Sequence, residues 1–220
     1  MSSALSSSNW RVPATLGDSC RRDGTAVLSP DGRLAVPVGF DDHSIGRVDA
    51  EITLVEYGDF ECPRCAQAAG AARELRGRFV DEVRFVFRNL PMARIHPHAE
   101  RAAEAAEAAA VEDRFWEMHD LLFEHQSDLS DESLLRYAAH SGADPAAVAE
   151  ALRLGTMRAR VERDATGGIR SGVTCAPAFF INSVRYPESD LVESFTFRSC
   201  LDKLTQAVEA RVGGEVRRTL

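Results

Sequence analysis

Two cysteines, Cys62 and Cys65, stand where a strand pattern gives way to a helical pattern. The stretch before them, EITLVEYG, is rich in β-branched and aromatic residues and ends at Gly58, which predicts a buried strand. After Cys62 the apolar residues recur at helical spacing and Pro63 suits the first turn, so a helix is expected over residues 62–79. The chain must therefore fold with two thiols at a strand-to-helix junction.

A second strand is predicted over residues 83–90, VRFVFRNL, directly after this helix. A strand, a helix and a strand of these lengths imply a parallel pair joined by a right-handed crossover. Upstream, residues 25–36 contain the turn signature SPDG between two short apolar runs and predict a hairpin. The stretch PVGFDDHSIGRVDA that follows is expected to be a polar connection into the core.

Residues 97–166 carry helical signals throughout, beginning with Pro97. Alanines at every turn of HAERAAEAAEAAA favour a helix and allow close packing. A final helix of this block is expected over about 156–166. Further helix starts and ends are expected at capping residues, namely Asp113, Ser130, Asp144 with Pro145, Gly142 and Gly155.

The strand signal returns after the helical block. APAFFI and VRYPE predict a hairpin that turns at Asn182-Ser183, and a last helix is expected over about 197–212. The order of elements is therefore β-α-β, a block of helices, then β-β-α. This order predicts an α/β protein with a small mixed sheet and helices packed on it.

Composition narrows the class of protein. The chain has 220 residues and a net charge of −8, which fits one domain with an insertion and argues against nucleic acid or an anionic membrane as a partner. No apolar run approaches the roughly 18 residues of a membrane helix. The Ser-rich N-terminus does not show the apolar core of a secretory signal, so a cytoplasmic location is expected. The five cysteines are an odd number, which excludes a fully paired disulfide framework within one chain.

The Cys-X-X-Cys spacing has three common uses: half of a zinc site, a pair of inert buried cysteines, or a redox dithiol. A structural zinc site needs four ligands, and the sequence offers no second cysteine pair at metal-binding spacing. The strand-to-helix setting favours the redox dithiol, and no metal is expected. A helix N-terminus offers unpaired N–H groups and partial positive charge, which favour the thiolate of Cys62.

A larger stabilisation of that thiolate requires direct hydrogen bonds to sulfur from the N–H groups of residues 64 and 65, with help from Arg64. Pro63 fixes the turn and has no N–H that competes for the sulfur. Cys65 lies one turn inside the helix and is expected to be more sheltered. It can attack a mixed disulfide at Cys62 and release the substrate.

The motifs VEYGDFECPRC, HPHAERAAEAAEAA and GVTCAPAFFIN together resemble those of the DsbA-like thiol–disulfide oxidoreductases of the thioredoxin superfamily. The upstream LAVPVGFDDHSIG is similar to the lead-in of cytosolic and fused bacterial members, so the resemblance covers roughly residues 34–212. It implies a thioredoxin-like fold with a helical insertion between the β-α-β and β-β-α halves. The expected division is a disordered tail at 1–18, an N-terminal hairpin and lead-in at 19–48, a β-α-β half at 49–96, the insertion at 97–166 and a β-β-α half at 167–220.

The resemblance also implies roles for single residues. Cys62 matches the exposed nucleophile of the family, and Cys65 matches the resolving thiol. Pro177 matches a cis-proline loop that faces the dithiol, and the backbone of Ala176 before it would contact an extended substrate. Glu56 matches a buried acid, whose pKa should be raised and which could move protons for Cys65; the alternative for Glu56 is a strand-edge carboxylate facing water.

The chain departs from the family pattern at Cys175, where glycine is usual. This residue is expected to be either a small buried side chain or an extra redox thiol on the loop facing the dithiol. Cys20 and Cys200 lie outside the matched motifs, and no role follows for them. His96 and His98 are expected to be helix-start residues rather than catalysts.

The predicted function is that of an enzyme, a protein thiol–disulfide oxidoreductase that acts through a mixed disulfide as reductase, isomerase or oxidase. It would need no cofactor beyond a redox-active Cys62–Cys65 disulfide. Its partners would be protein or small thiol and disulfide substrates, with an electron donor or acceptor that the sequence does not identify. The alternatives are a redox-sensing binding module without turnover and a structural zinc domain.

Overall fold

A mixed sheet forms the centre of the fold in the computed structural model, which describes residues 32–186 together with residues 206 and 210. Within this part of the chain the strands run in the order β1-β3-β2-β4-β5. Strand β2 pairs parallel with β3, which confirms the predicted parallel pair. It also pairs antiparallel with β4, and β4 pairs antiparallel with β5, which confirms the predicted closing hairpin. The strands are β1 His43–Ile45, β2 Ile52–Gly58, β3 Val83–Asn89, β4 Ala178–Ile181 and β5 Val184–Arg185.

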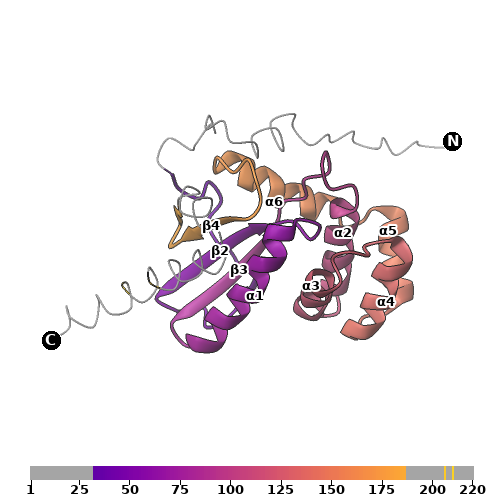
Figure 1. Cartoon of the computed structure of the whole chain (residues 1–220), viewed down its shortest axis with the longest axis horizontal. Helices are drawn as coiled ribbons and strands as arrows, with labels where there is room; N and C mark the ends of the chain where they lie inside the picture. Colours follow the sequence, from indigo (N-terminus) through magenta and orange to yellow (C-terminus); the bar gives the residue numbers. More distant parts are fainter. Residues whose placement is uncertain (1–31, 187–205, 207–209, 211–220) are drawn as a thin grey trace.

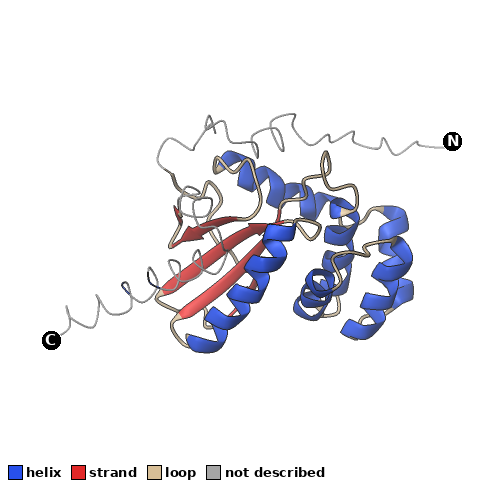
Figure 2. Ribbon diagram, in the orientation of Figure 1, coloured by secondary structure: helices blue, strands red, loops and turns tan. Residues whose placement is uncertain are grey.

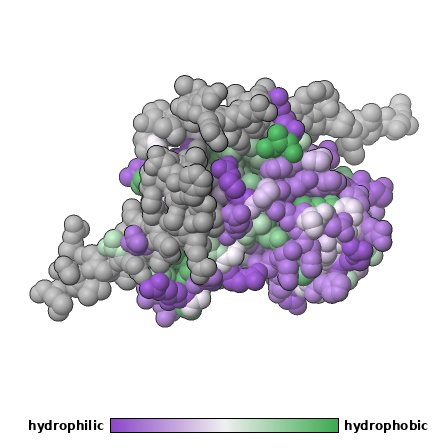
Figure 3. Space-filling view, in the orientation of Figure 1, coloured by the Kyte–Doolittle hydropathy of each residue, from purple (hydrophilic) through white to green (hydrophobic). Residues whose placement is uncertain are grey.

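The helices cover the sheet and form the insertion. Figure 2 shows α1 lying along the sheet, while α2 to α5 gather to one side of it and α6 leads the chain back. The face of the helical block seen in Figure 3 is mostly hydrophilic. The helices are α1 Pro63–Arg78, α2 Ala99–Ala110, α3 Phe115–Glu124, α4 Asp131–Ser141, α5 Pro145–Leu154 and α6 Arg158–Arg170.

The core is made by the two central strands and by small residues in α2. Side chains of β2 and β3 are buried on both faces, as expected for strands covered by helices on either side. Helix α2 buries most of its alanines, which lets its backbone approach the helices packed around it. The alanine pattern therefore serves packing, as the sequence indicated.

Local capping signals were predicted with mixed success. Ser130 accepts a hydrogen bond from the N–H of Ser133, and Asp144 accepts one from Ala146, so both cap their helices as predicted. Gly142 and Gly155 end these helices in the left-handed conformation. The prediction for Asp113 was wrong, because its φ is 60° and the residue directly before α3 is Arg114.

Strand β1 was not predicted, since it lies in the stretch expected to be a polar connection. It pairs antiparallel with β3, with Ser44 opposite Val86. A three-residue edge strand is held mainly by backbone hydrogen bonds, so it needs no apolar alternation that a sequence pattern would reveal. The predicted hairpin at 25–36 lies largely outside the described residues, and Arg33 forms a bridge with Val184. The last helix, expected over 197–212, also lies outside them except for Gln206 and Ala210, which are helical.

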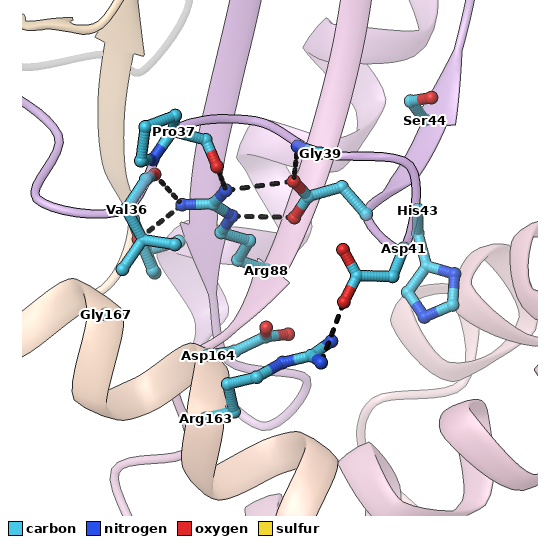
Figure 4. Close-up of polar contacts among 12 residues, drawn as sticks. Val36, Pro37, Gly39, Asp41, His43, Ser44, Arg88, Arg163, Asp164 and Gly167 are labelled. Carbon is cyan, nitrogen blue, oxygen red and sulfur yellow. Dashed lines mark hydrogen bonds and ion pairs between the residues drawn. The ribbon is translucent and has the colours of Figure 1, made fainter.

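Arg88 of β3 anchors the lead-in segment against the sheet (Figure 4). Its guanidinium is 3% exposed and forms a two-pronged ion pair with Asp42, at 2.8 and 2.9 Å. It also donates to the carbonyls of Val36 and Pro37 and to the hydroxyl of Tyr57. A buried guanidinium is stable only when its donors are satisfied, so this network fixes residues 36–42 beside β3.

Among residues 32–186, no helix is long and apolar enough to cross a membrane.

Candidate active site

The topology of the sheet brings the dithiol and the Pro177 loop to the same end of the sheet, where β2 finishes and β4 starts. Strand β2 ends at Gly58 and leads into Cys62, while the antiparallel β4 begins at Ala178 opposite Tyr57. Pro177 therefore lies beside the end of β2, and the peptide bond between Ala176 and Pro177 is cis. The Sγ atom of Cys62 is 3.5 Å from the carbonyl oxygen of Ala176. The two segments, more than 110 residues apart in the chain, form one site.

Cys62 is the residue before α1, and Pro63 occupies the first turn as predicted. Both Cys62 and Cys65 are free thiols in this structure. The pKa of Cys62 is lowered to about 6, first by a hydrogen bond from the Cys65 side chain and then by the backbone N–H groups of Cys65 and Arg64, while burial opposes the change. The two N–H donors are those that the helix terminus was expected to supply.

Cys62 is more exposed than Cys65 and has the lower pKa, as expected, but the difference in exposure is smaller than predicted. Cys62 is 6% exposed and Cys65 is fully buried, so the expectation of a well-exposed nucleophile is corrected. The loop that carries Ala176 lies against the Cys62 sulfur and covers it. The pKa of Cys65 is raised well above its ordinary value, mainly by burial and then by Cys62. Cys62 is thus the more readily ionised of the two thiols.

Arg64 points toward the Pro177 loop. One of its Nη atoms lies 3.2 Å from the Sγ atom of Cys175 and 3.5 Å from the carbonyl oxygen of Ala176. Cys175 is 7% exposed and is disulfide-bonded. Whether Cys175 takes part in redox chemistry stays a prediction.

Glu56 lies inside the sheet, fully buried, and does not face water. Within the described part of the chain neither of its carboxylate oxygens has a hydrogen-bond partner. Burial raises its pKa to about 8, and the negative charge of Cys62 adds to the effect. A Cβ atom on Gly58 would lie 2.4 Å from the ring of Phe87 and 3.3 Å from Glu56 Oε1, so only glycine fits between them. The burial agrees with the expectation for Glu56, while its role in moving protons is not tested.

The structure adds Asp59 and His96 to the site, which the sequence did not single out as functional. Asp59 is 1% exposed, and its carboxylate accepts hydrogen bonds from the backbone N–H groups of Glu61 and Met92 at 2.8 and 2.7 Å. His96 Nδ1 lies 2.8 Å from the same carboxylate. The position of Asp59 within DFECPRC was the available signal, but its partner could be recognised only after folding.

Gln126 is a second addition, from the loop after α3. Its side-chain amide donates to the carbonyl oxygens of Phe60 and Cys62, at 2.7 and 2.9 Å. The helical insertion therefore holds the loop that carries Cys62. Among the described residues, no group of three or more histidine, cysteine or acidic side chains is placed to hold a metal ion.

Comparison with known proteins agrees with this arrangement. The family model Thioredoxin_4, described as thioredoxin, matches residues 40–203. The chain is 44% identical over 164 residues to a protein named Na(+)/H(+) antiporter NhaA 1 of Salinispora arenicola, covering 74% of this chain and 25% of that protein. It is 46% identical over 154 residues to NhaA 3 of Salinispora tropica, covering 70% and 24%. The chain thus spans about a quarter of the length of these curated relatives.

Solved structures show the same fold. BdbD from Bacillus subtilis superposes with a TM-score of 0.71 at 23% identity, covering 84% of this chain and 99% of BdbD. The α-DsbA1 protein of Wolbachia pipientis gives a TM-score of 0.66 at 19% identity, with coverage of 86% and 100%. ScsC from Proteus mirabilis gives 0.63 at 18% identity, with coverage of 79% and 73%. The predicted resemblance is confirmed: the chain belongs to the thioredoxin family and has the fold of the DsbA-like thiol–disulfide oxidoreductases.

Proposed function

We propose that the protein exchanges disulfides with protein or small-molecule thiols through the Cys62-Pro63-Arg64-Cys65 dithiol. The observation that carries the proposal is the contrast between the two thiols. Cys62 has a pKa of about 6 and is a thiolate at neutral pH, whereas Cys65 is buried and protonated. A nucleophile and a resolving thiol need this division of roles.

The proposed reaction consists of two thiol–disulfide exchange steps. The Cys62 thiolate attacks one sulfur of a substrate disulfide, which forms a mixed disulfide and releases one substrate thiolate. Cys65 then gives its proton to the first released substrate thiolate or to water and attacks the Cys62 sulfur, which releases the second substrate thiolate and closes the Cys62–Cys65 disulfide. The dithiol loses two electrons and the substrate disulfide gains them. An external dithiol then reduces the Cys62–Cys65 disulfide and is itself oxidised.

The direction of net transfer depends on the potential of the compartment. A stabilised Cys62 thiolate favours the reduced form of the protein, and roughly 30 mV corresponds to about 1.4 kcal/mol for this two-electron couple. We propose a cytoplasmic location, where reductase or isomerase activity suits a reducing environment better than net oxidation. Cell fractionation of the full-length natural protein tests this location.

The loop before β4 supports a role for Ala176 and Pro177 in substrate binding. The carbonyl of Ala176 lies 3.5 Å from the Cys62 sulfur, so a peptide joined to Cys62 must pass along this backbone. The exposed backbone groups of a loop at the end of a sheet can pair with an extended peptide in the manner of an added strand. Arg64, which contacts the same carbonyl, would flank such a peptide.

Turnover of a disulfide-containing model protein with dithiothreitol as electron donor tests the function. The wild type should reduce the substrate, and Cys62→Ser should be inactive because it lacks the attacking thiolate. Cys65→Ser should instead accumulate a mixed disulfide on Cys62, which non-reducing electrophoresis and mass spectrometry would detect. If Cys62→Ser reduces the substrate at the wild-type rate, the assignment is wrong. A wild type that binds partners in a redox-dependent way without turnover would favour the sensing module.

A further inference from the structure

The pair of Asp59 and His96 lies beside the dithiol and has no part in the exchange steps described above. We propose that His96, held by Asp59, is a positioning residue that places a positive charge next to the dithiol and thereby favours the thiolate form of Cys62. This inference rests on the proposed function and identifies a further determinant of its nucleophile. It changes the expectation that His96 is only a helix-start residue.

The backbone of Asp59 contacts both cysteines. The N–H of Asp59 lies 3.4 Å from the sulfur of Cys65, and the N–H of Cys62 donates to the carbonyl oxygen of Asp59 at 3.1 Å. The side chain of Asp59 leads in another direction, to Met92 and His96. His96 is therefore one hydrogen bond away from a residue that contacts the sulfur of Cys65 and the backbone of Cys62.

The buried carboxylate of Asp59 places a negative charge close to the dithiol, and a positive charge is needed to balance it. The carboxylate of Asp59 is buried, and its negative charge raises the pKa of Cys62 and of Cys65. Unbalanced, it would oppose the Cys62 thiolate that the reaction needs. When His96 is protonated, its imidazolium, with Nδ1 2.8 Å from the carboxylate, offsets this charge. Because the His96 side chain is 18% exposed, its proton can exchange with water.

Three acidic groups, Asp59, Cys62 and Glu61, favour the charged form of His96. Its pKa is raised by the hydrogen bond to Asp59 first, against a smaller effect of burial, and then by the negative charges of Asp59, Cys62 and Glu61. Interaction between two charges is reciprocal, so a thiolate that raises the pKa of His96 must itself be stabilised by the imidazolium. Oxidation or alkylation of Cys62 removes the thiolate, and the pKa of His96 should then fall.

His98 provides a matched control within the same segment. Its Nδ1 lies 3.0 Å from Glu61 Oε1, and its backbone N–H donates to the other oxygen at 2.6 Å. This is the same kind of pair two residues further along the chain. However, the His98 side chain is 52% exposed, so water screens its charge. His98 should respond much less to the state of Cys62.

The first experiment uses the wild-type protein. NMR titration of the imidazole Cε1–H signals is compared between the reduced protein and protein carbamidomethylated at Cys62. The pKa of His96 should be higher in the reduced protein by at least about 0.5, equivalent to a threefold change in the protonation equilibrium, and the signal of the exposed His98 serves as the control. Equal His96 values in the two forms would overturn the proposal. The comparison does not depend on turnover, so its failure is distinct from failure of the proposed function.

The second experiment replaces the charge and keeps the hydrogen bond. In His96→Asn, the side-chain amide nitrogen can stand where Nδ1 stood. The rate of iodoacetamide labelling of Cys62 is measured from pH 4.5 to 9, with His98→Asn as the control. Labelling of His96→Asn should be at least about twofold slower than that of the wild type near pH 6, approach threefold slower at pH 4.5, and equal it above pH 8, where both are thiolates. An unchanged rate, or one reduced by the same factor at every pH, would show a structural role only and contradict the proposal.

Discussion

At the scale of single residues, Glu56 is notable because it is an ionisable side chain buried without a hydrogen-bond partner among the described residues. It is a carboxylic acid that is fully buried inside a strand, and its pKa is raised from 4.5 to about 8. The folded protein therefore keeps a proton that the unfolded chain loses at a lower pH. Its contribution to the free energy of unfolding is fully present below about pH 4.5 and is lost as pH rises to about 8.

Glu56→Gln tests this directly, because glutamine resembles the protonated acid. The variant should match the wild type near pH 4.5 and exceed its free energy of unfolding at pH 8 by on the order of 3 kcal/mol. Urea denaturation of the reduced proteins at several pH values measures the difference. Glu74→Gln, at an exposed position of α1, is the control and should show little change. A difference that stays constant from pH 4.5 to 8 would mean that Glu56 is not protonated in the fold.

At the scale of elements, α1 carries the dithiol at its N-terminus, and the rest of the helix packs through small apolar side chains. The helix begins with Pro63, buries Ala68, Ala72 and Leu75, and places Cys65 one turn inside. Gly70 lies mid-helix, and a Cβ atom there would meet no heavy atom within 4 Å among the described residues. This glycine lowers the stability of the helix, and none of the described residues packs closely enough to require it.

Two glycine-to-alanine substitutions should therefore have opposite effects. Gly70→Ala should raise the free energy of unfolding by roughly 0.5–1 kcal/mol, since alanine loses less conformational freedom in a helix. Gly142→Ala should lower it by about 1 kcal/mol or more, because φ is 86° at the end of α4 and Arg114 lies 3.3 Å from the added Cβ. Urea denaturation measures both. A Gly70→Ala protein less stable than the wild type would show a close approach at that surface.

At the scale of the whole molecule, the helical insertion reaches the active site through Gln126. Its two hydrogen bonds hold the carbonyls of Phe60 and Cys62, which belong to the loop between β2 and α1. The insertion is thus more than a cover for the sheet. It constrains the segment that carries Cys62.

Gln126→Ala should loosen this segment. The loss of two hydrogen bonds should lower the free energy of unfolding by about 1–3 kcal/mol, and amide hydrogen exchange should increase across residues 59–66. Mass spectrometry of exchanged peptides measures the local effect. Gln67→Ala, at an exposed glutamine of α1, is the control and should leave exchange in this segment unchanged. Equal exchange in both variants would mean that the loop is held without Gln126.

The sequence by itself determined the features that depend on near neighbours in the chain. The strand before Cys62, the helix that begins at Pro63 and the caps at Ser130 and Asp144 all follow from residues within a few positions of one another. Capping, proline geometry and apolar periodicity act over one or two turns, so a linear pattern records them. The motifs around the dithiol also indicated the family, which the comparisons confirm.

Only the tertiary structure decided how distant segments meet. The partnership of Asp59 with His96, the reach of Gln126 and the burial of Cys62 under the Ala176 loop join residues 37, 64 and 114 positions apart. Strand β1 likewise exists because β3 offers an open edge. The local sequence around these residues does not identify their distant partners. Their hydrogen bonds and their burial depend on which groups folding brings together. The electrostatic character of the dithiol is for that reason a property of the fold.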